Sequence, residues 1–275
     1  MNNPRIALID SGIGGLNVLN ALVNELPNEH FLYYGDNHNA PYGNKTTREL
    51  EELTFSIIEN LKDYSIKAYV LACNTLSVSV RTKLQGIVSV PVYAVFPPVE
   101  SAIIERKPTL LLATVKTVEG LAKSLGAKTE DMQEGTLAVK NNLVMAGLKE
   151  LARDIEDGIF NLTTINYRKR FDYINNVFNK EFCQKIFCKE YPFDRFYRVI
   201  LGCTHYNFAK KFIFDHFLPT KLSCGINNTV KMVKKGLFDQ KIAKNIPNLS
   251  DLKRIEFVGS GAKINRKVFL ECFLG

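Results

Sequence analysis

The chain has 275 residues, of which 46% are hydrophobic, and it carries a formal net charge of +8. This length allows one large domain or two of moderate size, and the hydrophobic share is sufficient for folded cores. The polar start and the short apolar run Ile6–Ile9, which ends at Asp10, predict neither a signal peptide nor a membrane-spanning helix. A cytoplasmic location is therefore expected, and the six cysteines, which follow no regular framework, are expected to be reduced thiols.

The positive charge suits an anionic partner, either a nucleic acid or a small carboxylate or phosphate ligand. Basic residues are locally dense only at 167–170, at Lys210-Lys211 and at 231–235, and elsewhere they are mixed with acidic and amide side chains. No helix-turn-helix, zinc-finger or aromatic RNA-binding pattern occurs. Nucleic-acid binding is therefore not expected.

Apolar runs alternate with helical repeats through the first half of the chain. Short apolar runs predict strands, and apolar residues that recur three or four positions apart predict helices. The predicted strands are Ile6–Ile9, Phe31–Tyr34, Lys67–Ala72, Pro91–Phe96 and Thr109–Ala113, and the predicted helices are Leu16–Leu26, Thr47–Leu61, Leu76–Leu84 and Val118–Leu125. Pro97-Pro98 cannot continue a central strand, so a domain boundary is placed there.

The second half repeats the alternation less regularly. Further strands are predicted at Leu137–Val139, Phe196–Leu201, Leu222–Cys224 and Ile255–Gly259, and further helices around Leu148, Leu151 and Ile155 and at Phe208–Phe217, Asn227–Phe238 and Ile264–Leu274. Charged and aromatic residues are mixed between Asn161 and Asp194, where helices are expected without definite ends. Alternating strands and helices predict parallel sheets covered by helices on both faces.

Polar residues follow several of the predicted strands directly. They are Asp10 and Ser11, Cys73 with Asn74 and Thr75, Thr114 with Thr117, and Cys203 with Thr204 and His205. In parallel α/β sheets the ligand site lies beyond the carboxyl ends of the strands. The recurrence of these polar groups therefore predicts a site at that edge.

Two loops admit a structural as well as a functional interpretation. The glycine-rich turn at 12–15 suits an anion at a helix start, but it lacks the Walker lysine and the dinucleotide spacing, so a tight turn without a ligand is an alternative. Tyr42, between Pro41 and Gly43, either caps the core or lines a ligand site with its backbone.

Two of the cysteines differ from the other four. Cys73 and Cys203 each stand between a strand and a predicted helix start, where N–H groups favour the thiolate. The other four, which lack the following threonine and polar partner, are interpreted as small apolar residues: Cys183, Cys188, Cys224 and Cys272.

The thiols could also serve as zinc ligands or as a single nucleophile. Cys183 and Cys188 with Cys203 and His205 could supply four zinc ligands, but their spacing is not that of a zinc finger, and no metal site is expected. Cys203 and His205 could form a nucleophile and base, although two residues on one loop need not touch. Two strand-end thiols instead suggest one base on each face of a substrate, and thus inversion at an acidic carbon.

Four motifs in the same order resemble those of bacterial glutamate racemases, in the cofactor-independent aspartate/glutamate racemase family. They are Asp10-Ser11-Gly12-x-Gly14-Gly15, Tyr34-Gly35-Asp36 with Pro41-Tyr42-Gly43, Ala72-Cys73-Asn74-Thr75, and Leu201-Gly202-Cys203-Thr204-His205-Tyr206. The resemblance covers residues 6–208 and implies two doubly wound parallel-sheet lobes related by pseudo-twofold symmetry, with the active site between them. It divides the chain into a first lobe of residues 1–97 plus 209–275 and a second lobe of residues 98–208.

The resemblance also implies the activity and the roles of the residues. The reaction expected is the interconversion of L- and D-glutamate without pyridoxal phosphate or another cofactor, supplying D-glutamate for peptidoglycan, by a homodimer. Cys73 would take the α-proton of D-glutamate and Cys203 that of L-glutamate, with assistance from Asp10, His205 and, on a helix, Glu150. The expected substrate ligands are Ser11, Pro41, Tyr42, Gly43, Asn74, Thr75, Thr114, Thr117 and Thr204.

The sequence departs from the family pattern at several places. Pro97-Pro98-Val99 stands for the usual Glu-Pro-Gly, Ala113-Thr114 for Gly-Thr, Asn141-Asn142 for Cys-Pro, and Ser223-Cys224-Gly225 for an Asp-Ser-small motif. The changes at Val99 and Asn142 bear on lobe closure and on recognition of the substrate side chain. A racemase for aspartate or another amino acid, or an inactive paralogue that binds a ligand, therefore remains an alternative.

Overall fold

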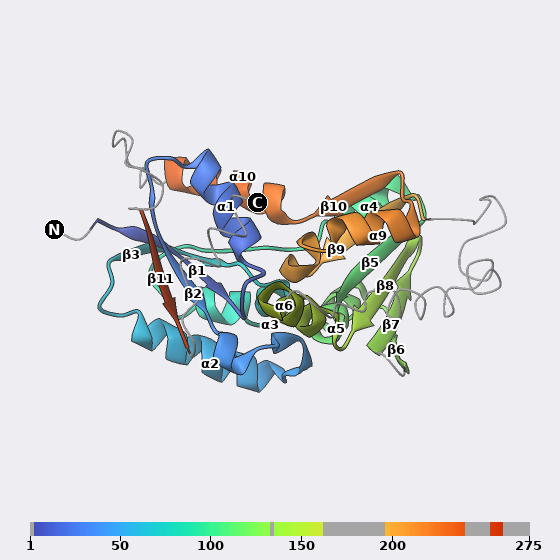
Figure 1. Cartoon of the computed structure of the whole chain (residues 1–275), viewed down its shortest axis with the longest axis horizontal. Helices are drawn as coiled ribbons and strands as arrows, with labels where there is room; N and C mark the ends of the chain where they lie inside the picture. Colours follow the sequence, from blue (N-terminus) through green and yellow to red (C-terminus); the bar gives the residue numbers. More distant parts are fainter. Residues whose placement is uncertain (1–2, 133–134, 162–195, 240–253, 261–275) are drawn as a thin grey trace. The chain divides into compact units, whose positions relative to one another are not determined.

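The computed structural model describes residues 3–132, 135–161, 196–239 and 254–260, with the side chains of 157–161 left out (Figure 1). The chain divides into two compact units, one of residues 1–96 together with 226–275 and one of residues 97–225. The predicted helix Ile264–Leu274, the segment Asn161–Asp194 beyond its first residue, and the cysteines Cys183, Cys188 and Cys272 lie outside the described residues.

The first unit contains a five-stranded sheet in which every pairing is parallel. In spatial order its strands are β11 (Ile255–Gly259), β2 (His30–Gly35), β1 (Arg5–Asp10), β3 (Ile66–Leu71) and β4 (Val92–Ala94). The connecting helices are α1 (Leu16–Glu25), α2 (Thr47–Asn60), α3 (Asn74–Gln85) and α10 (Ile226–Asp239), with short 3-10 turns η1 (Asn37–Asn39) and η2 (Tyr42–Asn44).

Helices cover both faces of this sheet. Alternate residues of each strand point to opposite faces, so each strand packs against both helical layers. Ala7 and Ile9 of β1 pack with Leu50 of α2 and Leu76 of α3 in one apolar cluster. On the other face lie α1 and α10, which pack against each other (Figure 1). The fully buried strand residues, such as Ile6–Ile9, are apolar on both faces, as expected for a parallel sheet between two helical layers.

The second unit contains a six-stranded, mostly parallel sheet. In spatial order its strands are β10 (Lys221–Cys224), β9 (Arg198–Gly202), β5 (Thr109–Thr114), β8 (Leu143–Leu148), β7 (Gly135–Lys140) and β6 (Thr129–Met132). Its helices are α4 (Val99–Glu105), α5 (Val115–Leu125), α6 (Leu151–Asn161) and α9 (Lys210–Phe217), with a 3-10 turn η3 (Thr204–Asn207).

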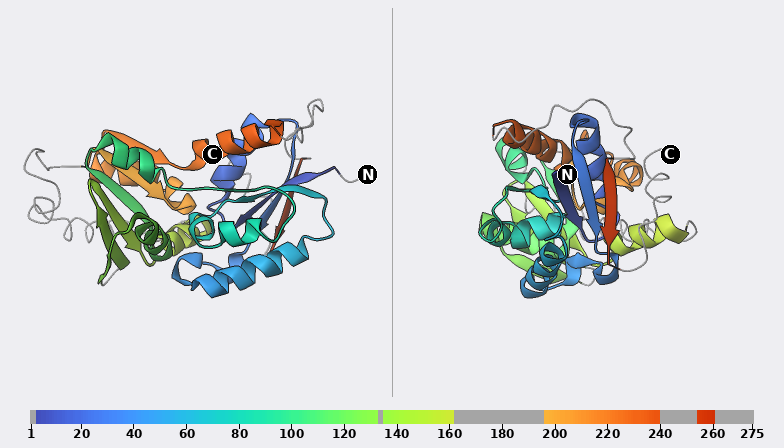
Figure 2. Two further views of the ribbon diagram at one scale, coloured as in Figure 1. Left: turned by 180° about the vertical axis from the view of Figure 1, so that it is seen from behind. Right: turned by 90° about the vertical axis from the view of Figure 1, so that its left-hand side faces the viewer.

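One apolar cluster fills the space between this sheet and two of its helices. It joins Leu112 of β5 and Leu201 of β9 to Ile155 of α6 and Ile213 of α9. On the sheet's other face lies α5, which contacts β5, β7 and β8 and stands in front of the sheet in the left-hand view of Figure 2. The unit is therefore also a sheet between helical layers.

One prediction about this region was wrong. The residues around Leu148 were predicted as helical, but β8 extends to Leu148 and α6 begins only at Leu151. A parallel sheet was expected, and β10, β9, β5 and β8 pair in parallel, whereas β7 pairs antiparallel with both β6 and β8. Asn141-Asn142 is the two-residue turn between β7 and β8, with Asn141 in the left-handed region at φ 53°, and so short a connection only permits antiparallel pairing.

The end of the second unit also differs from the predicted lobe boundary at residue 208. Strand β10 pairs in parallel with β9, with Cys224 beside Leu201, and α9 packs on the same sheet. The unit therefore continues to Gly225 before the chain returns to the first unit through α10.

A buried arginine joins β9 to α4 in the second unit. Arg198, at the start of β9, is 1% exposed, contacts the Glu105 carboxylate at the end of α4, and donates to Ser101 Oγ at 3.0 Å. The same carboxylate also pairs with the half-exposed Lys221 at 3.3 Å. One acidic group thus has a buried and an exposed cationic partner.

These two partners make a matched test. Arg198→Ala is expected to destabilise the protein by about 3 kcal/mol, because it removes a large, fully buried side chain and its bonds to α4. Lys221→Ala is expected to cost less than about 1 kcal/mol, because solvent screens an exposed pair. The free energies of unfolding of both variants, measured in urea, check this. Equal losses of stability would contradict the assignment of the stabilisation to the burial of Arg198.

Candidate functional site

The first unit brings Asp10 and the glycine turn together at the carboxyl end of β1. Asp10 is fully buried, and its Oδ2 accepts from the Gly12 N–H at 3.0 Å. Tyr33 donates its hydroxyl to the Gly12 carbonyl at 2.7 Å, which holds the turn. A Cβ at Gly15 would lie 2.7 Å from the Asp10 Cβ, so only glycine allows the helix to start this close to the carboxylate.

Cys73 lies on the neighbouring strand, at the start of α3. It follows β3 in extended conformation and forms the N-cap of α3, whose first turn contains Asn74 and Thr75. All three side chains are at most 6% exposed. The positive end of a helix favours a thiolate at this position. The Asn74 Oδ1 is buried and accepts no hydrogen bond from the described residues.

A third element at this edge is the loop after β2. It contains the cis Ala40–Pro41 peptide bond and then the turn η2, in which Tyr42 and Gly43 are buried. The Tyr42 hydroxyl donates to Asp36 Oδ2 at 2.5 Å. Burial, and next the negative charge of Asp36, raise the pKa of Tyr42, so its hydroxyl stays protonated. Tyr42 therefore both fills the apolar cluster and faces the polar edge.

In the second unit, threonines lie at the carboxyl end of the central strand β5. Thr114 is the N-cap of α5, and its Oγ1 accepts from the Thr117 N–H at 3.3 Å. The two hydroxyl oxygens are 2.9 Å apart. Both residues are buried, so two hydroxyl groups and a helix start meet beside β9. Such a group of donors suits a carboxylate.

Cys203 follows β9 and faces a histidine and a glutamate. Its Sγ is 3.8 Å from His205 Nδ1, although the two residues are separated only by Thr204. The Nε2 of His205 contacts a carboxylate oxygen of Glu156, on α6. Tyr206 donates to the Ala113 carbonyl at 3.1 Å and thereby anchors η3 to the end of β5. The result is a buried series of thiol, imidazole and carboxylate.

The pKa of His205 reflects two opposing causes. Burial lowers it, because the imidazolium loses its hydration, but the Glu156 charge and the hydrogen bonds that the imidazolium donates to Cys203 and Glu156 outweigh that effect and raise it well above 6.5. Because the folded-state pKa is raised, this interaction stabilises the protein fully below about pH 6.5. The stabilisation is lost as the pH rises through the folded-state value.

Glu156, and not Glu150, is the acidic residue in contact with His205. Glu150 precedes α6 and pairs with Arg153 at 3.2 Å, and a role for it beside the thiols stays a prediction. It was chosen by counting forward from Asn141-Asn142, which lie in the turn before β8 rather than at its carboxyl end. There the Asn142 amide donates to the carbonyls of Ala102 and Lys107 and has a structural role.

The predicted residues thus form two groups, one at the carboxyl edge of each sheet. The first unit holds Asp10, Ser11, Pro41, Tyr42, Gly43, Cys73, Asn74 and Thr75, and the second holds Thr114, Thr117, Cys203, Thr204 and His205. Sequence reasoning missed Glu156, and it did not establish that Cys203 and His205 touch. In each group a cysteine follows the end of a strand, and an ionisable side chain lies at the same edge of the sheet.

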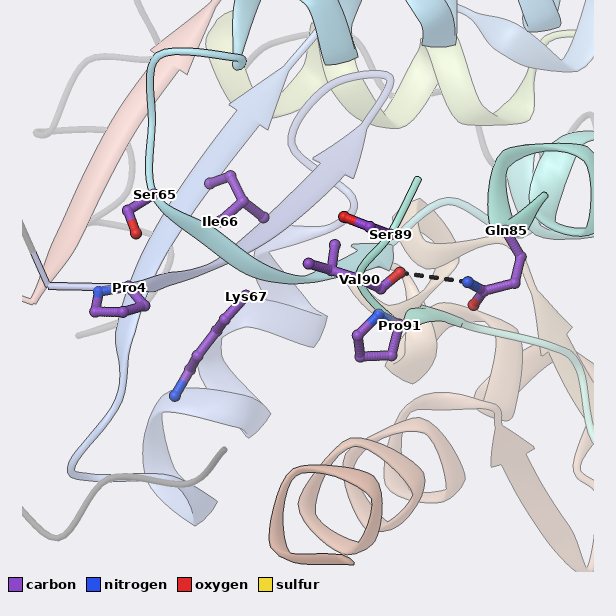
Figure 3. Close-up of a pocket in the computed structure, with 8 residues that line it drawn as sticks. All are labelled: Pro4, Ser65, Ile66, Lys67, Gln85, Ser89, Val90 and Pro91. Carbon is purple, nitrogen blue, oxygen red and sulfur yellow. Dashed lines mark hydrogen bonds between the residues drawn. The ribbon is translucent and has the colours of Figure 1, made fainter. Parts of the chain in front are cut away.

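The described residues also form a cavity away from these two groups. A cavity of about 680 Å³ lies at the opposite, amino-terminal edge of the first sheet, and Figure 3 shows the Gln85 amide bonded to the Val90 carbonyl at its rim. Its one charged lining residue, Lys67, pairs with the buried Glu29.

Within the described residues, no cluster of three or more His, Cys, Asp or Glu side chains is placed to hold a metal, and no helix is long and apolar enough to span a membrane.

The known proteins that the chain resembles are glutamate racemases. The chain is 37% identical to a glutamate racemase of Clostridium acetobutylicum over 86% of this chain and 84% of that protein. Its fold is similar to glutamate racemase from Thermus thermophilus in complex with beta-chloro-D-alanine, with a TM-score of 0.71, 27% identity and coverage of 99% and 93%. The fold of a Francisella tularensis glutamate racemase in complex with D-glutamate matches with a TM-score of 0.70 and 22% identity over 100% and 95%. No protein-family model matches the chain.

The contact between His205 and Glu156 predicts a selective change in titration. Glu156→Gln is expected to lower the pKa of His205 below its wild-type value, because the largest charge that opposes the effect of burial is then removed. NMR titration of labelled histidine measures this shift. Glu150→Gln is the matched control and should leave the titration of His205 unchanged, since Glu150 pairs with Arg153. If the pKa of His205 shifts in Glu150→Gln but not in Glu156→Gln, Glu150 is the acidic partner of His205 instead.

Proposed function

The chain belongs to the glutamate racemase family, and we propose that it interconverts L- and D-glutamate without a cofactor, with Cys73 and Cys203 as the two acid–base groups. One observation carries this proposal. Each sheet presents one buried thiol at its carboxyl edge, and an ionisable partner lies at the same edge. A single nucleophilic thiol would need only one of these groups, whereas inversion at carbon needs two.

The proposed reaction moves one proton off the substrate and another onto it. Starting from L-glutamate, the Cys203 thiolate removes the α-proton and becomes a thiol, and the C–H electron pair remains on the substrate as a carbanion. The Cys73 thiol then gives its proton to the opposite face and becomes a thiolate, so that D-glutamate leaves. The reverse reaction exchanges the two roles, and no oxidant or reductant is required.

The partners of the thiols differ, and so do their proposed tasks. In the second unit, His205 with its raised pKa carries a proton next to Cys203, and Glu156 keeps it charged and oriented. In the first unit, Asp10 is fixed by the Gly12 N–H and stands at the end of the strand beside Cys73. We assign it the corresponding proton handling at Cys73.

Substrate binding is proposed for the remaining polar groups. The buried Asn74 Oδ1, which accepts no hydrogen bond from the described residues, would take a donor from the substrate ammonium. The hydroxyls of Thr114 and Thr117 at the start of α5 would hold a carboxylate. The other proposed ligands are Ser11, Pro41, Tyr42, Gly43, Thr75 and Thr204.

The same proposal extends to assembly and location. We propose a homodimer, as the family resemblance implies, and a cytoplasmic location, where the thiols on which the reaction depends are kept reduced. The role in supplying D-glutamate for peptidoglycan follows from the resemblance in the same way. Sedimentation at micromolar concentration tests the first point, and a monomer at all concentrations would overturn it.

Single cysteine variants test the two-thiol reaction. Cys73→Ser and Cys203→Ser are each expected to reduce racemisation by at least about a hundredfold, because a serine hydroxyl is a much weaker acid and base at neutral pH. In heavy water, Cys73→Ser should still exchange the α-proton of L-glutamate without inversion, and Cys203→Ser that of D-glutamate. Optical rotation and α-deuterium uptake provide the two measurements.

Cys224→Ser is the control, since Cys224 is a further free cysteine that lies on β10. It should retain wild-type turnover. Full activity in both site variants would overturn the mechanism, and exchange of the opposite enantiomers would reverse the assignment of the two thiols. Exchange with aspartate but not glutamate would favour the alternative of another substrate, and no exchange with either would favour a binding protein.

A further inference from the structure

Asp36 is a buried carboxylate at the carboxyl end of β2 to which no role has been assigned above. It is 1% exposed, and its N–H donates to the Asp10 carbonyl at 2.9 Å, so it adjoins the end of β1. Three side chains donate to it. They are the Tyr42 hydroxyl at 2.5 Å, the Asn39 amide at 3.0 and 3.1 Å, and the Ser260 hydroxyl. We call these four residues the Asp36 cluster.

The Asp36 cluster joins segments that are far apart in the sequence. Asn39 and Tyr42 belong to the loop after β2, whereas Ser260 directly follows β11, the edge strand beside β2. A second bond links the same segments, because the His38 N–H donates to the Ser260 carbonyl at 3.2 Å. The last described strand of the chain therefore holds the loop that carries Tyr42.

Tyr42 connects this cluster to the thiol of the first unit. Tyr42 and Cys73 are 1% and 6% exposed and belong to the same apolar cluster. The charges of Cys73 and Asp10 contribute to the raised pKa of Tyr42 after burial and Asp36, which is consistent with a hydroxyl close to both groups. The turn η2, which carries Tyr42, also contacts α3, whose N-cap is Cys73.

We propose that Ser260 and Asp36 are positioning residues for Cys73: by holding the Tyr42 hydroxyl and its loop, they keep the ring against the thiol and exclude water from it. The segment at the end of β11 thereby contributes to the site without touching the substrate. This inference rests on the proposed function for its effect on turnover, but its effect on the accessibility of Cys73 is independent of the reaction.

Alkylation of the two thiols in the full-length protein tests the proposal. Ser260→Ala should increase the rate at which iodoacetamide modifies Cys73 about threefold or more, and leave the rate at Cys203 unchanged, as followed by peptide mass spectrometry. The same variant should lower kcat/KM about tenfold, equally for both enantiomers because their free energies are equal. Ser260→Thr, which keeps the hydroxyl, should restore both values.

Ser124→Ala is the matched control, because Ser124 also donates one bond to a partner, the Leu121 carbonyl at 2.8 Å, but lies on α5. It should change neither rate. Tyr42→Phe removes the other hydroxyl that donates to Asp36 and should reproduce the selective increase at Cys73, so the test does not depend on one variant. Unchanged alkylation of Cys73 in both variants, or an equal increase at both cysteines, would overturn the proposal. If the wild type fails to racemise while the selective increase persists, the proposed function is wrong and the positioning role stands.

Discussion

Parallel pairing of the central strands is the constraint on which both halves of the site depend. In the first sheet Ile9 pairs with Leu71, so Asp10 and Cys73 emerge from neighbouring strands at the same edge. In the second sheet Ala113 pairs with Gly202, which places Thr114 beside the strand end that carries Cys203. Gly202 allows this close fit, since a Cβ there would lie 2.9 Å from that of Ala113. Each thiol is thus positioned by backbone hydrogen bonds rather than by a flexible loop.

The two thiols have different electrostatic surroundings despite their similar positions. Cys203 faces an imidazole that a carboxylate keeps charged, which is the arrangement that also activates a single nucleophilic cysteine. Cys73 has no such histidine in its motif and instead shares its edge with Asp10 and the start of a twelve-residue helix. The second thiol and its separate partner are what distinguish proton transfer on two faces from nucleophilic catalysis at one.

Local patterns in the sequence were sufficient for most of the strands, the strand-end polar residues and the fold class, because apolar runs and helical repeats depend on neighbours in the chain. They failed at β6 and β8, which were not predicted, and the last residue of β8, Leu148, was assigned to the following helix. A short buried strand and a buried helical turn have the same composition, and only pairing with β5 decides between them. The contact between Cys203 and His205 was equally out of reach, since it depends on the backbone of η3.

Glu150 was chosen by counting forward from Asn141-Asn142, although Glu156 lies on the same predicted helix. Once α6 begins at Leu151, its buried residues Leu151, Ala152 and Ile155 define one face of the helix. Glu156 lies four residues after Ala152 and therefore close to that face, where an acidic side chain is costly unless it meets a cationic partner. A charge beside an otherwise apolar helix face is a signal that the sequence contains, and with the helix start placed correctly it would have pointed to a partner such as His205.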